Sequence, residues 1–77
     1  MLSDELVRFI REYAKKEVDE ITEDTVMAAE LGIDSLTFVR LVNDAENTFD
    51  ITIEDEKLIR IRTVGDFAEL ISKTNNG

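Results

Sequence analysis

The apolar residues between positions 36 and 49 recur every three or four residues. On a helical projection of about 100° per residue, five of them share one face: Phe38, Leu41, Val42, Ala45 and Phe49. Gly32 offers a flexible turn shortly before this run. The pattern predicts an amphipathic helix from about Ser35 to Phe49.

Two other segments show signals of helix formation. Ser3 can cap a first helix that is expected to end near Lys16. Its apolar face holds Leu6, Val7, Ile10, Tyr13 and Ala14. Near the other end of the sequence, Thr63 and Asp66 resemble a capping box with Asp in place of the usual Glu or Gln. A last helix is therefore expected, with an apolar face of Val64, Phe67, Ala68, Leu70 and Ile71, and a frayed end from Thr74 to Gly77.

The two connecting regions differ in character. Residues 17–34 are expected to form an irregular loop whose apolar side chains pack onto the body: Ile21, Val26, Met27, Leu31 and Ile33. Residues 51–62 hold the acidic run Glu54–Glu56, which suits the first turn of a short helix. The sequence has no proline and no convincing alternating run beyond residues 51–53. The predicted fold is all-α, a four-helix bundle of three main helices and one short third helix, in a single domain over 1–77.

Composition excludes several kinds of chemistry. The 77 residues include no Cys and no His, so the chain has no disulfide, no thiolate nucleophile and no His to act as a general base or zinc ligand. The acidic run is not expected to bind a metal, because Asp55 stands where a calcium-binding loop counted from Asp50 needs glycine. We expect no enzyme.

The charge of the chain limits its partners. Eighteen acidic and nine basic residues give a net charge of −9, which repels nucleic acids and anionic membranes and favours partners with basic surfaces. The sequence shows no secretory signal and no apolar run that could span a bilayer. A cytoplasmic monomer is expected.

Ser35 stands at the start of the helix predicted over 35–49, within the sequence LGIDSL. A serine there can simply start a helix, and the tripeptide Asp-Ser-Leu alone is a weak signal. On the projection, however, Leu36 lies almost opposite the core face, with Val39 and Asn43 beside it. This partly apolar surface beside Ser35 suggests a docking patch.

Residues 31–36, with Val39, Leu41, Val42 and 49–51, resemble the acyl carrier proteins and their peptidyl carrier relatives. The resemblance covers nearly the whole chain and extends to 53–56 and 63–66. It implies that a transferase attaches 4′-phosphopantetheine from coenzyme A to Ser35, flanked by the motif residues Asp34 and Leu36. The arm would then hold acyl groups as thioesters.

The resemblance also implies the partners: a phosphopantetheinyl transferase and the enzymes that load and process the acyl group. The residues expected to contact them are Leu36, Thr37, Val39, Arg40 and Asn43. Carriers of fatty-acid synthesis usually have carboxylates where Thr37 and Arg40 stand, so the chain looks closer to carriers of polyketide or nonribosomal peptide assembly, or to a specialised free-standing carrier. Fatty-acid synthesis, a peptidyl or aminoacyl carrier, and an unmodified acidic helical adaptor stay open.

Overall fold

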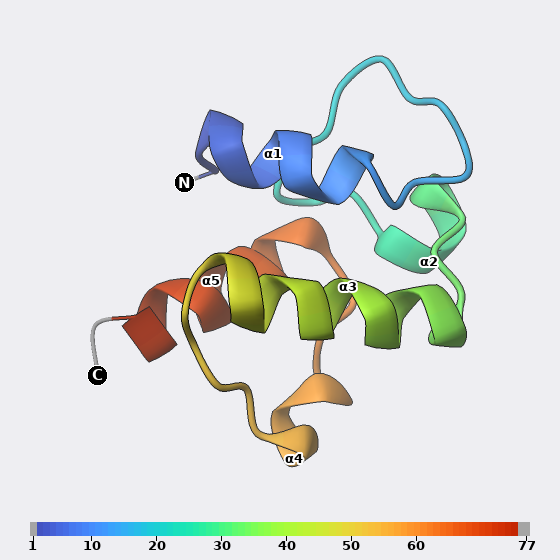
Figure 1. The fold of residues 1–77 in the computed structure, drawn as a ribbon. Coiled ribbons are helices and arrows are strands. Elements are labelled where there is room, and N and C mark those ends of the chain that lie inside the picture. The colour runs from blue at the N-terminus through green and yellow to red at the C-terminus, as the bar shows by residue number, and fades with distance from the viewer. Residues whose placement is uncertain (1, 76–77) are drawn as a thin grey trace.

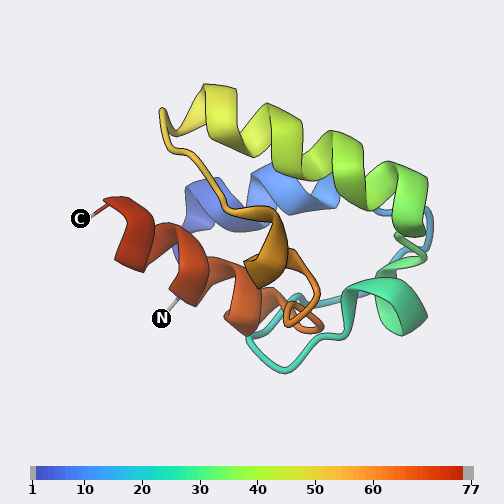
Figure 2. The same cartoon turned by 90° about the horizontal axis from the view of Figure 1, so that it is seen from below.

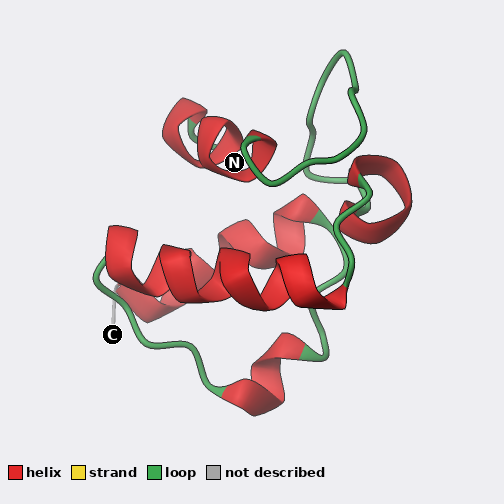
Figure 3. Cartoon of the chain, turned by 45° about the vertical axis from the view of Figure 1, so that its right-hand side comes forward, coloured by secondary structure: helices red, strands yellow, loops and turns green. Residues whose placement is uncertain are grey.

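The computed structural model describes residues 2–75, which fold into helices joined by loops (Figures 1 and 3). The helices are α1 (Asp4–Arg11), α2 (Met27–Leu31), α3 (Ser35–Thr48), α4 (Asp55–Leu58) and α5 (Val64–Asn75). The described residues include no β-strand, and Val26 and Thr63 form an isolated antiparallel bridge. The all-α prediction is confirmed, with α2 as an additional short helix.

The core lies among α1, α3 and α5, and α4 lies beneath α3 and α5 in Figure 1, so that in the view from below in Figure 2 it covers the space between them. The predicted face of α3 supplies the buried Leu41, Val42 and Ala45, while Phe38 and Phe49 are half-buried against them. The other helices and loops complete the core with Leu6, Ile10, Ile21, Met27, Leu31, Ile33, Ile51, Ile53, Val64, Phe67 and Ile71. The predicted core faces of the long helices are therefore largely confirmed.

The α1 helix ends at Arg11, so its predicted end near Lys16 was wrong. The next residues form tighter turns, in which the amide of Tyr13 donates to the carbonyl oxygen of Ile10 at 2.9 Å. The amides of Lys15 and Lys16 both donate to the carbonyl oxygen of Leu31, at 2.8 and 3.2 Å. The chain leaves the helix early because these amides bind the end of α2 instead.

The loop predicted over 17–34 contains α2, which the sequence analysis did not foresee. Its expected anchors are correct: Ile21, Met27, Leu31 and Ile33 are buried and Val26 is half-buried. Gly32 has a left-handed backbone with φ of 69°, and its amide donates to the carbonyl oxygen of Ala28 at 3.1 Å. It is thus the cap that ends α2 rather than only a flexible turn.

The starts of the last two helices agree with the prediction. Glu54 precedes α4, and Asp55 and Glu56 lie in its first turn. Thr63 and Asp66 form the capping box: the Thr63 amide donates to Asp66 at 3.1 Å and the Asp66 amide donates to the Thr63 hydroxyl at 3.0 Å. The α5 helix continues through Asn75, past the predicted start of fraying, and residues 76–77 lie outside the described part.

The start of α5 packs tightly against the loop before α2. The amide of Gly65 donates to the carbonyl oxygen of Glu23 at 2.9 Å, and a Cβ atom at position 65 would lie 2.8 Å from that same oxygen. Real Cβ atoms do not approach backbone so closely. Only glycine therefore allows this contact.

We expect Gly65→Ala to destabilise the fold by about 1–3 kcal/mol, because the methyl group forces the loop away from α5. Helix propensity alone predicts the opposite sign, since Ala is a better helix former than Gly by about 1 kcal/mol. Urea unfolding followed by circular dichroism measures the difference, with Ser72→Ala at an exposed position of α5 as control. A Gly65→Ala variant as stable as the parent would show that this contact is not tight.

A second expectation concerns alkaline pH. The hydroxyl of the half-buried Tyr13 donates to the carboxylate of Asp44 on α3, and its ring packs on Phe9 with centroids 5.3 Å apart. Burial, and then the hydrogen bond to Asp44, raise the pKa of Tyr13 to about 12. Because the folded pKa exceeds the ordinary value of about 10, this contribution to stability is complete below about pH 10 and is lost as the pH rises towards 12.

We therefore expect the stability of the parent to fall between about pH 10 and 12 by more than that of Tyr13→Phe, which cannot ionise. Denaturant midpoints across this range compare the two proteins. Tyr13 is the single tyrosine of the sequence, so ultraviolet absorbance reports its titration directly. Titration near pH 10 would show that the contact with Asp44 does not persist in solution.

Candidate functional site

Ser35 is the first residue of α3, and its side chain is exposed. Asp34 caps the helix, since its Oδ1 accepts a hydrogen bond from the Thr37 amide at 2.8 Å. The cap is therefore Asp34 and not Ser35. The Ser35 hydroxyl makes no hydrogen bond with another residue in the described part of the chain. It is held in place by the helix but left accessible to solvent.

Asp34 also connects the site to the segment after α1. Its Oδ2 lies 2.9 Å from the Nζ of Lys15. The hydrogen bond from the Thr37 amide, followed by the contact with Lys15, holds the pKa of Asp34 well below its usual range. Lys16 binds the same region, because its Nζ donates to the carbonyl oxygen of Ala29 at 3.1 Å. The two lysines thus fix the α2–α3 connection that leads to Ser35.

An open groove of about 540 Å³ begins beside Ser35. Asp34 and Ser35 are among its lining residues, and Arg62 adds a cation. The rest of the lining is apolar and comes from α2, α3, α4 and the adjoining loops: Val26, Met27, Ala28, Ala29, Ile33, Phe38, Leu58 and Ile61. The sequence analysis named Asp34 and Ser35 as site residues but predicted no groove, because the groove depends on α2.

The predicted docking residues lie along α3. Leu36 and Val39 are 73% and 54% exposed, although both are apolar. Arg40 and Asn43 are also exposed, whereas Thr37 is half-buried and its amide is taken by Asp34. Because residues three or four apart are neighbours on a helix, Leu36, Arg40 and Asn43 lie on one continuous face.

Residues 2–75 contain no group of three acidic side chains placed to hold a metal ion. Within the same range, no helix combines the length and the apolar character needed to cross a membrane. The arrangement offers an exposed hydroxyl at a helix start, beside an apolar groove. Such a site suits covalent attachment of a group rather than catalysis by the chain's own side chains.

Comparison with known proteins agrees with this geometry. Residues 4–71 match the family model described as "Phosphopantetheine attachment site". The chain is 45% identical over 62 residues to the acyl carrier protein of Exiguobacterium sibiricum, covering 80% of this chain and 78% of that protein. It is 39% identical over 70 residues to the acyl carrier protein of Sulfurovum sp., and the match covers 91% of this chain and 93% of that protein.

Solved structures show the same similarity. A putative acyl carrier protein from Mycobacterium tuberculosis superposes with a TM-score of 0.82 at 28% identity, covering 91% of this chain and 93% of that one. The acyl carrier protein of Thermotoga maritima superposes with a TM-score of 0.77 at 29% identity, and the match covers 94% of this chain and 84% of that one. The chain belongs to the acyl carrier protein family, whose members bear a 4′-phosphopantetheine group and act as carriers rather than enzymes.

Proposed function

We propose that Ser35 bears the phosphopantetheine arm and that the chain carries acyl groups to partner enzymes through it. The observation that carries this proposal is the exposed hydroxyl of Ser35 at the first position of α3, beside an apolar groove. This hydroxyl makes no hydrogen bond with another of the described residues. The arm supplies the terminal thiol that the Cys-free sequence lacks. The relatives named above are acyl carrier proteins, which favours acyl over aminoacyl cargo.

Comparison among the serines favours Ser35. The sequence has three, at positions 3, 35 and 72. The Ser3 hydroxyl accepts a hydrogen bond from the Leu6 amide at 3.1 Å and caps α1. Ser72 lies within α5, where the backbone amides are used by the helix. Ser35 alone stands at a helix start with its hydroxyl unused by the described residues.

The start of α3 suits a phosphodiester. The first amides of a helix have no partner within the helix, and the helix dipole favours negative charge at that end. Asp34 occupies the Thr37 amide, which leaves those of Ser35 and Leu36 for the added group. The charge of the Asp34 carboxylate opposes a phosphate, and its ion pair with Lys15 offsets part of that repulsion. The chain has no His, and we propose that the transferase supplies the base that activates the hydroxyl.

The groove beside Ser35 gives the cargo a place on the carrier. Its apolar lining matches an acyl chain, whose burial is favourable by about 0.8 kcal/mol for each CH₂ removed from water. The groove is open to solvent, so cargo can return to a partner enzyme. We propose that Leu36, Val39, Arg40 and Asn43, with the polar Thr37 between them, form the surface that such an enzyme contacts.

We expect Ser35→Ala to lose all modification and to stay folded. Because Asp34 provides the cap, the change in unfolding free energy should stay within about 0.5 kcal/mol. The test incubates each protein with coenzyme A, Mg²⁺ and a broad-specificity phosphopantetheinyl transferase, followed by intact-mass measurement. Ser72→Ala is the matched control and should gain one phosphopantetheine like the parent. Modification of Ser35→Ala, or an unmodified parent, would contradict the assignment and favour an unmodified adaptor.

The pathway is inferred from Arg40. This exposed cation stands on the proposed docking surface, where carriers of fatty-acid synthesis usually have a carboxylate. We propose that the chain serves a polyketide or other specialised acyl pathway, with fatty-acid synthesis as the alternative. Its cytoplasmic location and monomeric state stay predictions.

Arg40→Glu tests this inference. It should raise the rate of acyl transfer from a fatty-acid synthase malonyl transferase several-fold, because that class of partner meets an acidic carrier surface. Arg8→Glu, at an exposed position of α1, makes the same change in charge away from the site and should leave the rate unchanged. Equal effects of both variants would show that net charge, not the position of Arg40, sets the rate. A parent already as fast as Arg40→Glu would favour fatty-acid synthesis.

A further inference from the structure

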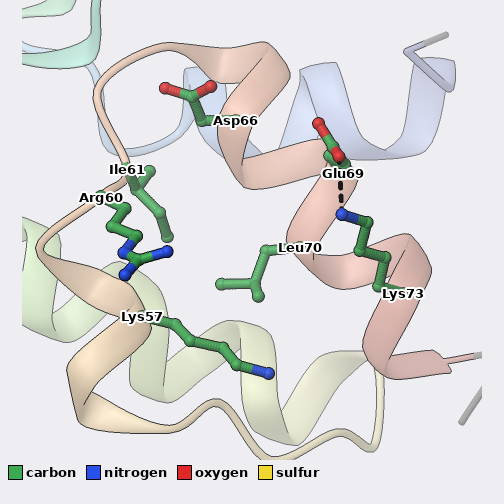
Figure 4. A pocket seen from close by; sticks show the side chains of 7 residues that line it. All are labelled: Lys57, Arg60, Ile61, Asp66, Glu69, Leu70 and Lys73. Atoms are coloured by element: carbon green, nitrogen blue, oxygen red, sulfur yellow. Dashed lines mark ion pairs between the residues drawn. The ribbon is translucent and has the colours of Figure 1, made fainter.

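A second open hollow, of about 390 Å³, lies between α4 and α5. Figure 4 shows its lining side chains, which come from α4, the α4–α5 connection and α5. They are Lys57, Arg60, Ile61, Asp66, Glu69, Leu70 and Lys73. The hollow includes no residue of α3, and it shares only Ile61 with the groove beside Ser35. It is therefore a separate surface from the proposed attachment site.

This surface differs in charge from the rest of the chain. Residues 57–62 read Lys-Leu-Ile-Arg-Ile-Arg and contain three cations and no acid, although the whole chain has a net charge of −9. Lys73 adds a cation from α5. A third of the nine basic residues thus stands within six positions. Three acids, Glu54–Glu56, stand directly before this run in and beside α4, so the cations act on a ligand by direct contact and not through a net positive field.

The hollow is lined by two carboxylates as well as three cations, and both carboxylates contact neighbouring groups. Asp66 accepts hydrogen bonds from the amides of Arg62 and Thr63, both at 3.1 Å. Glu69 pairs with Lys73 at 2.8 Å, shown by the dashed line in Figure 4. The Arg60 guanidinium, by contrast, makes no hydrogen bond or ion pair with any residue between positions 2 and 75.

Lys57 is only loosely held. Its Nζ lies 3.7 Å from a carboxylate oxygen of Glu54 in a pair whose side chains are half exposed or more, and such surface pairs contribute little. In Figure 4 the Lys57 and Arg60 side chains extend over the hollow, and Leu70 points between them from α5. The hollow therefore presents two available cations around an apolar centre.

Apolar surface completes the hollow. Ile61 and Leu70 are half-buried and face it. Next to Arg60 in the sequence, Ile59 is 86% exposed, the largest exposure among the large apolar side chains of the described residues.

We propose that this hollow binds a short acidic segment of a partner protein. One apolar side chain of the segment packs on Ile61 and Leu70, while its carboxylates face Arg60 and Lys57. An Arg binds a carboxylate through two parallel hydrogen bonds, which fixes the orientation of the segment. Arg60 gives this face a cation that can bind a carboxylate in spite of the negative charge of the whole chain. The binding does not require the arm on Ser35.

The chemistry favours a peptide over other anions. A free phosphate or a nucleic acid would use the cations but not the apolar centre, and the net charge of −9 opposes a long polyanion. A peptide uses both features, since an acidic segment can carry an isolated leucine. Its affinity should be modest and should fall with salt, as for other contacts made by surface charges.

The test is a titration of the unmodified, ¹⁵N-labelled chain with a twelve-residue peptide that holds one leucine flanked by Asp and Glu. We expect amide shifts confined to residues 57–61 and 70–73, and weaker binding at high salt. Arg60→Gln and Arg60→Glu should each weaken binding at least tenfold. Arg8→Glu is the matched control and should change the dissociation constant by less than twofold. A peptide with serine in place of leucine should also bind more weakly.

Other outcomes overturn the proposal. Shifts spread over other faces, or binding unchanged in both Arg60 variants, would exclude this hollow as the site. Equal shifts produced by citrate or by a short oligonucleotide would indicate a general anion site. Self-association that Arg60→Gln abolishes would identify a second copy of this chain as the occupant. Because no transferase or coenzyme A is used, failure here is independent of the result for Ser35.

Discussion

The position of Ser35 depends on the carboxylate of Asp34. One oxygen of this carboxylate caps α3 through the Thr37 amide, and the other binds Lys15 from the segment after α1. The first bond starts the helix at Ser35 without using the serine hydroxyl. The second ties that start to a segment 19 residues earlier. A single short side chain therefore caps the helix that begins at Ser35 and adds an exposed ion pair to the contacts that join this helix start to the rest of the protein.

The wall of the groove beside Ser35 is held by backbone hydrogen bonds at both ends of α2. At one end, the Leu31 carbonyl oxygen accepts the amides of Lys15 and Lys16. At the other, the Met27 amide donates to the carbonyl oxygen of Arg62 at 3.0 Å, next to the bridge between Val26 and Thr63. A helix of five residues is too short to be stable alone. It persists because its ends are bound to distant parts of the chain, and this makes the groove a product of the tertiary fold.

This difference between local and distant causes explains what could be predicted from the sequence. The α3, α4 and α5 starts follow local rules, such as apolar spacing, acidic first turns and the Thr63–Asp66 capping box. The end of α1 and the existence of α2 do not follow such rules, because both depend on hydrogen bonds between distant segments, from Lys15 and Lys16 to Leu31 and from Met27 to Arg62. At the candidate site, the place of Ser35 at the start of α3 and the exposure of Leu36 opposite the core could be predicted from the sequence. The ion pair from Lys15 and the groove lining could not, since no local pattern reports them.

The same reasoning applies to charge. A net charge of −9 describes the field that a partner meets at long distance, and it favours basic surfaces. On contact, screening leaves only the nearest charges to act, and these differ from the average. Arg40 stands exposed on the α3 face, and residues 57–62 carry three cations without an acid. A partner drawn by the acidic field of the whole chain therefore meets, on contact, surfaces on which cations and carboxylates alternate. The total charge accelerates encounter, while the local arrangement selects which surface can dock.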